Sequence, residues 1–185
     1  MLEVLQVIGM VLILIFCIAV IIIGLMYEWS LLATRAPFIC LPEDVVNSVI
    51  AELDLKDDSV FYDLGCGDGR VLEACAAQNS KCKLAGIDKA RVAIWCARWR
   101  LRKIKNVKIS HKNFFKCDFS DATQIYTYLF PDLMNDLLPK LKRDLKPGTK
   151  LVTCDFKFTD WEPERIIDLN RSKDSLGRTL YIYRF

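Results

Sequence analysis

At 185 residues, the chain is long enough for one domain with a substantial core and too short for two sizeable ones. Its formal net charge is only +3, yet residues 81–116 hold 12 Lys and Arg against one acid, Asp88, a net +11, and the remainder, with 14 basic and 22 acidic residues, carries −8. Eight scattered cysteines without a C-x-x-C pair, and a single histidine, argue against a disulfide framework and a metal site and indicate reduced thiols in a reducing compartment.

The first predicted element is a helix that spans a membrane. Val7 to Met26 is a run of 20 residues without a charged side chain, long enough to cross a hydrocarbon layer of about 30 Å. A cleaved signal peptide fits less well, because no basic residues precede the run and no clear small-residue cleavage site follows it. A buried core helix is the other alternative. We therefore expect residues 1–29 to form a single-pass anchor, with Tyr27 and Trp29 at the membrane interface.

The charges that flank this run predict its orientation. Only Glu3 precedes it, whereas Arg35 and the basic region follow, so the positive-inside rule places the rest of the chain on the cytoplasmic side. Residues 30–41 are expected to be a linker, and residues 42–185 to be the domain. The domain opens with a helix from Pro42, because proline suits the first turn and the acidic residues after it suit the positive end of a helix.

A glycine-rich turn between a strand and a helix is the most informative motif of the chain. Val60 to Leu64 has the β-branched and aromatic composition of a buried strand, and a helix-forming run starts at Arg70. Between them lie Asp63, Gly65, Gly67 and Gly69. The spacing excludes a P-loop and the dinucleotide fingerprint G-x-G-x-x-G, whose third glycine would fall at Arg70. A carboxylate beside the turn repels phosphate and suits a ligand with positive charge.

A second strand, Lys83 to Asp88, ends in an acid that can accept hydrogen bonds from ribose hydroxyls. With the glycine turn, this acid makes the chain resemble the class I S-adenosylmethionine (SAM)-dependent methyltransferases, whose first motif is [D/E]-x-G-x-G-x-G. The resemblance implies an α/β fold, a Rossmann-like seven-stranded sheet with helices on both faces after the membrane helix, and SAM as the cofactor. The cofactor-binding residues that it implies here are Asp63, Gly65, Cys66, Gly67, Gly69, Asp88 and Lys89.

A helix from about Lys89 to Ile104 combines an apolar face with a basic stripe. The apolar face, expected to pack on the sheet, comprises Ala90, Ala93, Ile94, Ala97, Leu101 and Ile104. The stripe comprises Arg91, Arg98, Arg102 and Lys105, with Trp95 and Trp99 beside it. It is either a solvated face with packed Trp rings, or an interfacial surface where cations meet anionic head groups and Trp rings sit at the polar boundary. Nucleic-acid binding is the weaker alternative, because no other signal supports it.

The remaining elements complete the sheet. Strands are expected over residues 107–110, 122–129 and 151–155, a helix over 133–144, and two more strands over 165–169 and 179–183 that pair across the turn at 175–177. After the third strand, Asn113 and Phe114 stand where this fold contacts the adenine ring, so Asn113 could bond the base edge and Phe114 cover its face. A place in the core is the alternative for Phe114 and Phe115. His111 is expected to be structural.

The ends of the fourth and fifth strands carry the residues that are candidates to bind the methyl acceptor. Ligands of an open α/β sheet bind at the carboxyl ends of its strands, which here carry Tyr128 and Asp155. The string Tyr128-Leu-Phe-Pro131 replaces the [DN]-P-P-[YF] common in amino-methyltransferases of DNA bases, which argues against base methylation. A lysine amine needs only its neutral form, and desolvation in aromatic surroundings lowers its pKa. Tyr128 and Asp155 are therefore candidates to position an amine, with a core role as the alternative for Tyr128.

Shorter strings extend the resemblance to one subfamily. They are Ala36-Pro-Phe-Ile-Cys-Leu-Pro42, Tyr62 to Arg70, the Trp/Arg-rich helix, Tyr128 to Pro131, Leu138-Pro-Lys-Leu141, Leu145-Lys-Pro-Gly148, and Asp155-Phe156 with Trp161. Together they resemble the membrane-anchored lysine methyltransferases of mitochondria, which modify the ATP-synthase c-subunit and the adenine nucleotide translocase, and their prokaryotic relatives. The resemblance implies a protein N-methyltransferase with a membrane-protein substrate, on the cytoplasmic side or, in mitochondria, the matrix side. It also implies that Phe38 belongs to a lid over the cofactor.

Two other functions remain open at this point. The anchor fits methylation of a lipid head group or a small amine equally well. A non-catalytic SAM-binding scaffold at a membrane is the third reading, which the intact set of Asp63, Gly65, Gly67 and Asp88 disfavours. A nucleic-acid partner and a metal ion are not expected.

Overall fold

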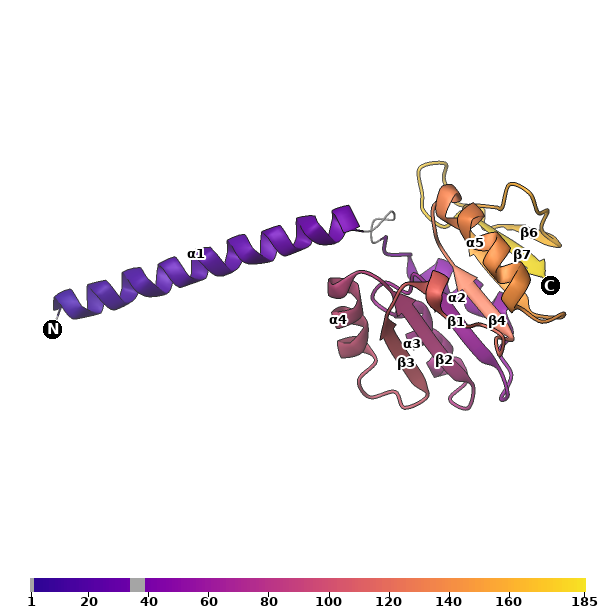
Figure 1. The fold of residues 1–185 in the computed structure, drawn as a ribbon, viewed down its shortest axis with the longest axis horizontal. Coiled ribbons are helices and arrows are strands. Elements are labelled where there is room, and N and C mark those ends of the chain that lie inside the picture. The colour runs from indigo at the N-terminus through magenta and orange to yellow at the C-terminus, as the bar shows by residue number, and fades with distance from the viewer. Residues whose placement is uncertain (1, 34–38) are drawn as a thin grey trace.

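The structure, a computed structural model, describes residues 2–33 and 39–185 and consists of an N-terminal helix followed by an α/β sheet (Figure 1). The helices are α1 Leu2–Ala33, α2 Glu43–Leu53, α3 Arg70–Gln78, α4 Arg91–Arg100 and α5 Pro131–Asp144, with a short 3-10 helix η1 Phe114–Lys116. The strands are β1 Val60–Leu64, β2 Lys83–Asp88, β3 Val107–His111, β4 Gln124–Thr127, β5 Lys150–Cys154, β6 Arg165–Asp168 and β7 Thr179–Arg184. Each predicted helix and strand is therefore present, with ends that differ by a few residues.

The seven strands form one sheet in the order β3-β2-β1-β4-β5-β7-β6. Strands β1 to β5 are parallel to one another, whereas β7 runs antiparallel to both β5 and β6. The sheet confirms the predicted seven-stranded fold and the predicted pairing of its last two strands. The strand order reverses between β1 and β4, and in open α/β sheets ligands bind at the carboxyl ends of the strands beside such a reversal.

Helices cover both faces of the sheet, as the sequence predicts. Buried residues of α2, α3 and α4 form one core cluster with one face, and those of α5 form a second cluster with the other. Four cysteines are buried side chains in the first cluster, Cys66, Cys75, Cys82 and Cys154. They act as small apolar fillers of the core.

Close packing of α3 on β2 depends on Gly86. A Cβ atom at this position would lie 2.5 Å from Leu72 Cδ1 and 2.9 Å from Cys66 Sγ, closer than atoms can approach without a shift. The absent side chain thus lets the helix that follows the glycine turn sit directly on the neighbouring strand. This contact helps hold the turn against β2, the strand that ends in Asp88.

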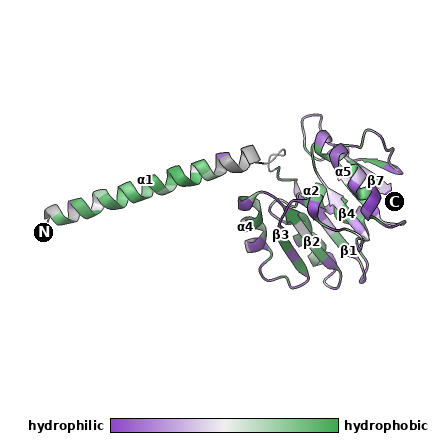
Figure 2. Cartoon of the chain, viewed as in Figure 1, coloured by the Kyte–Doolittle hydropathy of each residue, from purple (hydrophilic) through white to green (hydrophobic). Residues whose placement is uncertain are grey.

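The N-terminal helix is apolar along most of its length and projects away from the sheet (Figures 1 and 2). Its segment Gln6–Met26 is long and apolar enough to cross a membrane, and none of it is buried within the structure, unlike the buried core helix that is the alternative. The helix continues to Ala33, past the expected start of the linker at residue 30, because Ser-Leu-Leu-Ala offers no helix breaker. The side chains of Tyr27 and Trp29 lie outside the described part of the chain.

Candidate functional site

The glycine turn after β1 adopts a backbone conformation that side chains disfavour. Gly65, Gly67 and Gly69 have φ angles of +81°, +53° and +78°, in the left-handed region that glycine adopts without steric cost. The amides of Gly65 and Cys66 both donate to the carbonyl of Ile87, at 2.8 and 3.2 Å, which ties the turn to the end of β2. The alternating glycines are therefore required by the shape of the turn.

Asp88, the acid at the end of β2, holds the turn from the other side. Its Oδ2 accepts a hydrogen bond from the amide of Gly67 at 3.0 Å, and its Oδ1 accepts one from the amide of Ala90 at 2.8 Å. A carboxylate offers about four acceptor positions, so two remain for a ligand. The structure thus brings together Gly67 and Asp88, two of the predicted cofactor residues, and shows that Asp88 also shapes the backbone around it.

Asp63, the acid that precedes the first glycine, is buried with only 2% of its surface exposed. Within residues 2–33 and 39–185, no group donates a hydrogen bond to its carboxylate. Burial, together with the negative charges of Asp88 and Asp68, raises the pKa of this carboxyl well above its ordinary value. A positive charge beside this carboxyl would stabilise its ionised form against burial and the two neighbouring acids, so the position fits a ligand with positive charge.

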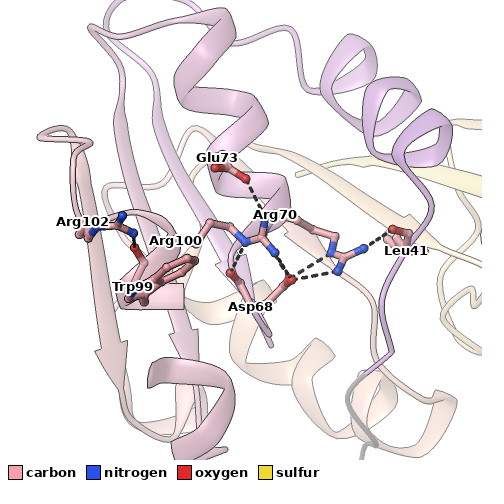
Figure 3. A network of polar contacts seen from close by, with 7 residues as sticks. All are labelled: Leu41, Asp68, Arg70, Glu73, Trp99, Arg100 and Arg102. Atoms are coloured by element: carbon pink, nitrogen blue, oxygen red, sulfur yellow. Dashed lines mark hydrogen bonds and ion pairs between the residues drawn. The ribbon is translucent and has the colours of Figure 1, made fainter. Parts of the chain in front are cut away.

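Asp68, inside the glycine motif, is the centre of an ion-pair network that the sequence does not predict (Figure 3). Its carboxylate pairs with Arg70 Nη2 at 2.9 Å and with Arg100 Nη2, from the end of α4, at 2.6 Å. Arg100 also pairs with Glu73 of α3 at 2.9 Å, while Arg70 Nη1 donates to the carbonyl of Leu41 at 2.6 Å. The network joins the segment before α2, the glycine turn, α3 and α4.

Asp68→Asn should destabilise the protein by about 2 kcal/mol. Removal of one partner from a fully buried ion pair costs more, roughly 3–5 kcal/mol. We expect the smaller value because the side chains of Arg70 and Arg100 are 30% and 35% exposed, so solvent screens both ion pairs. Burial alone would raise the pKa of the Asp68 carboxyl, but the hydrogen bond and charge of Arg70 and the charge of Arg100 lower it. The stabilisation is therefore present above the unfolded pKa of about 3.9 and disappears as the pH falls through the lower folded pKa.

Urea denaturation of wild type and Asp68→Asn at neutral pH and in acid measures this contribution. The difference in the free energy of unfolding between the two proteins should be present at neutral pH and should disappear at pH values below the pKa of Asp68. Asp58→Asn removes the same charge from an exposed position and should change little. Equal stability of wild type and Asp68→Asn at neutral pH would contradict a structural role for the network.

The two candidates for the methyl-acceptor end of the site, Tyr128 and Asp155, are hydrogen-bonded to each other. The Tyr128 hydroxyl donates to Asp155 Oδ2 at 3.0 Å. The same carboxylate accepts from the backbone amides of Gly177, Arg178 and Thr179, at 2.7, 2.6 and 3.3 Å. With four donors, Asp155 clamps the turn between β6 and β7 to the end of β5 and orients Tyr128. It has no acceptor position left over for an incoming amine.

Tyr128 belongs to a row of aromatic rings at this edge. Its ring stacks on Phe156, with ring centres 6.1 Å apart, and the ring centre of Phe130 lies 5.8 Å from that of Phe156. Burial and the negative charge of Asp155 raise the pKa of Tyr128 above its ordinary value, so the phenol is neutral at physiological pH. The ends of β4 and β5 therefore present a wall of aromatic rings.

Tyr128→Phe and Asp155→Ala should have different consequences. Tyr128→Phe removes one hydrogen bond and should cost about 1 kcal/mol, whereas Asp155→Ala leaves three backbone amides without their acceptor and should cost about 2 kcal/mol or more. Urea denaturation measures both, and hydrogen exchange at residues 177–179 should accelerate only in Asp155→Ala. Unchanged exchange there would show that the carboxylate does not hold the turn.

The remaining predicted residues lie around the same edge, with one exception. Asn113 Oδ1 accepts from the amide of Phe115 at 3.2 Å and caps η1. Phe114 is 6% exposed and belongs to the second core cluster, while Phe115 is half-buried. Lys89 is exposed, and its carbonyl bonds the ring of His111 at 2.8 Å. Phe38, the candidate lid residue, lies outside the described residues.

The hydrogen-bonding groups and charges of Asp63 and Asp88 fit those of SAM. Asp63 supplies a buried carboxyl for a cation, with no hydrogen-bond donor in the part of the chain that the structure describes, and Asp88 keeps acceptor positions for hydroxyl groups. Both stand at the carboxyl ends of adjacent parallel strands, directly beside the point where the strand order reverses.

Comparisons with known proteins agree with this geometry. Residues 63–165 match the family described as the ANTKMT methyltransferase domain. A protein-lysine N-methyltransferase from Saccharolobus islandicus is 31% identical over 152 residues, which cover 80% of this chain and 93% of that protein. The Homo sapiens lysine N-methyltransferase named for the c-subunit of ATP synthase is 26% identical over 133 residues, and the match spans 56% of its length.

A solved structure shares both sequence and fold with the chain. It is the crystal structure of an RNA methyltransferase from Salinibacter ruber in complex with S-adenosyl-L-homocysteine. The two chains are 30% identical with a TM-score of 0.72, over 79% of this chain and 93% of that one. The similarity therefore extends over nearly the whole sheet domain.

Proposed function

The chain belongs to the family of the ANTKMT methyltransferase domain and is a SAM-dependent methyltransferase; from this premise we propose that it methylates the side-chain amine of a lysine in a membrane protein. The similarity to the Saccharolobus islandicus enzyme, 31% identical over 93% of its length, carries the proposal for the substrate class. Relatives named for the ATP synthase c-subunit and the adenine nucleotide translocase support a membrane protein as the substrate.

The proposed cofactor site lies at the ends of β1, β2 and β3. SAM supplies a methyl group bonded to a sulfonium sulfur. When an amine nitrogen bonds to the methyl carbon, the carbon–sulfur bond breaks and the sulfur leaves as a thioether. Asp63 would balance positive charge of the cofactor, Asp88 would accept from the ribose hydroxyls, and the turn from Gly65 to Gly69 would allow close approach of the backbone. Asn113, Phe114 and Lys89 would flank the base and ribose, and Phe38 would close over them.

The proposed acceptor site lies at the ends of β4 and β5. The aromatic wall of Tyr128, Phe130 and Phe156 would desolvate a lysine side chain and favour its neutral, nucleophilic form. Because the carboxylate of Asp155 is fully used, we assign it a positioning role through Tyr128. The proton that the amine loses on methylation goes to solvent.

We also propose that α1 anchors the enzyme in a membrane with the domain on the cytoplasmic or matrix side. The unburied apolar segment Gln6–Met26 supports the span. The basic residues that follow it, and the single acid that precedes it, support the orientation.

Methylation of RNA is a second candidate, because a solved relative 30% identical to the chain is titled an RNA methyltransferase. The string Tyr128-Leu-Phe-Pro131 at the acceptor side differs from that of base amino-methyltransferases, so we rank RNA below lysine.

Methyl-labelled SAM distinguishes the acceptors. The full chain is incubated with native membranes, with lipid extracted from them, and with total RNA, and Asp88→Ala serves as the inactive control. Label in protein that resists alkali and elutes as methyl-lysine after hydrolysis is the expected result. Label confined to lipid or RNA would overturn the lysine assignment, and label in no fraction despite SAM binding would favour the non-catalytic scaffold.

A further inference from the structure

Helix α4 presents an exposed face that the proposed chemistry does not use. Trp95 and Trp99 are 69% and 63% exposed, and Val92 is 41% exposed, although the rest of the sheet domain buries most of its large apolar side chains. Trp95 and Trp99 are one helical turn apart, and Val92 lies a turn before Trp95. The three side chains therefore form one apolar strip on the outside of the helix.

A row of cations borders this strip. Arg91, Arg98 and Arg102 are exposed, and no acidic residue of the described chain forms an ion pair with them. At 100° per residue, Arg91 and Arg98 share with the apolar strip an arc of about 120°, and Arg102 follows two residues after the last residue of α4. The buried residues Ala93, Ile94, Ala97 and Leu101 occupy the opposite side and pack on the sheet, as the sequence predicts.

Two details show how the cations and rings are arranged (Figure 3). The guanidinium of Arg102 lies over the Trp99 ring, 4.4 Å from its centre, and donates to the Trp99 carbonyl at 2.7 Å. Arg100, in contrast, turns inward to Asp68 and Glu73. Arg98 donates to the carbonyl of Ile109 at 3.5 Å. The charges of the outer arginines are thus not neutralised by an ion pair within the described chain and can meet an external anion, while the inner arginine holds the helix in place.

We propose that this face of α4 docks on the surface of an anionic phospholipid bilayer. Exposed Trp rings beside unpaired arginines match the polar boundary of a membrane, where indoles sit among head groups and cations pair with lipid phosphates. The proposal rests on the anchoring by α1 proposed above and extends it to a second contact.

The position of α1 supports a membrane as the occupant rather than a soluble partner. Residues of α1 and α4 lie within contact distance of each other, and the C-terminal end of α1 points to the side of the domain that carries α4 (Figure 1). Leu41, held by Arg70, lies eight residues after the end of α1, a stretch of chain that spans at most about 30 Å. A domain tethered so closely stays within reach of the lipid surface.

Docking of α4 has a consequence for the active edge. The helix starts three residues after Asp88, and its ten residues have a length of roughly 15 Å. The carboxyl edge of the sheet would therefore be held close to the head groups. Such an orientation selects lysines near the membrane surface over those on distant soluble domains.

Fluorescence quenching in lipid nanodiscs tests this contact with the full chain. The protein is reconstituted in phosphatidylcholine with and without phosphatidylglycerol, each with brominated acyl chains near the head group as the quencher. Subtracting the fluorescence of the double variant Trp95→Phe/Trp99→Phe from that of the wild type isolates the signal of Trp95 and Trp99 from that of Trp29 and Trp161. In the anionic discs that signal should fall by at least half, and it should recover in pure phosphatidylcholine or high salt.

Charge reversal supplies the matched comparison. Arg91→Glu/Arg98→Glu/Arg102→Glu should abolish the quenching, whereas Lys142→Glu/Lys146→Glu/Lys173→Glu, with the same change in charge on exposed positions elsewhere, should preserve it. Unquenched rings in anionic discs that still carry the protein would overturn the docking and leave the anchor intact. Quenching of the rings by added single-stranded RNA, with none by lipid, would also overturn it and assign the face to nucleic acid. A chain that does not enter the discs would instead refute the anchor.

Discussion

Asp63→Asn is expected to weaken SAM binding about 100-fold while leaving the ligand-free protein at least as stable as the wild type. Asp63 is 2% exposed, and its carboxylate has no donor within the described residues. The free protein therefore gains nothing from the charge and bears the cost of burying it beside Asp88 and Asp68. A positively charged ligand recovers that cost, so the charge should matter for binding alone.

The pH dependence of the same variant follows from the raised pKa. A carboxyl whose folded pKa is raised contributes stability that is fully present below the unfolded pKa of about 3.9 and is lost as the pH rises through the folded pKa. Wild type should therefore lose stability relative to Asp63→Asn as the pH rises above the pKa of the carboxyl in the unfolded chain. Binding of the cofactor should lower the pKa of Asp63 again and release protons in this range.

Thermal unfolding across pH and titration calorimetry in two buffers of different ionisation enthalpy measure these effects. Asp58→Asn, at an exposed position, should change neither stability nor binding. An Asp63→Asn protein that is clearly less stable than wild type at neutral pH, or that binds SAM with wild-type affinity, would contradict the role assigned to this carboxylate.

Asp88→Ala is expected to weaken SAM binding by about 100-fold or more and to cost about 1–2 kcal/mol of stability. The substitution removes the acceptor for the Gly67 and Ala90 amides, which lie 3.0 and 2.8 Å from the carboxylate oxygens. Two effects therefore add: the acceptors for the ribose hydroxyls are lost, and the glycine turn is released from β2.

Asp88→Asn separates these two effects. Its amide oxygen can still accept from one backbone amide, so stability should lie between wild type and Asp88→Ala. Affinity should remain strongly reduced, because an amide is a weaker acceptor than a carboxylate. Calorimetry and urea denaturation on the same samples check both, and full SAM affinity in Asp88→Ala would falsify the assignment of this acid to the cofactor site.

Much of the fold follows from local patterns. The apolar run at the N-terminus, the short β-branched strands and the helical periodicity of residues 89–104 each reflect a rule that acts within a few residues. The glycine turn belongs to the same class, because its positive φ angles exclude most side chains wherever the turn occurs. The sequence therefore predicted the seven strands, their helices and the methyltransferase resemblance.

The roles of individual acids depended on the tertiary structure. Asp155 looked available to position an amine, but three amides from residues 177–179 occupy it together with Tyr128. Asp68 carried no distinguishing signal, and its partner Arg100 lies 32 residues away. A hydrogen-bond acceptor is satisfied by whatever donors the fold brings within about 3 Å, and donors from distant segments leave no local pattern.

By itself, then, the sequence determined what is local: where strands and helices form, which turn requires glycine, which helix is apolar enough for a membrane, and which face of residues 89–104 turns to the sheet. Only the tertiary structure decided which acids are free. It left Asp63 buried without a hydrogen-bond donor among the described residues and committed Asp155 and Asp68 to the scaffold. It kept Trp95, Trp99, Arg91 and Arg98 of α4 exposed while Arg100 turns inward. The reason is that a side chain's availability depends on the groups that surround it in space, and those groups come from parts of the chain far apart in sequence.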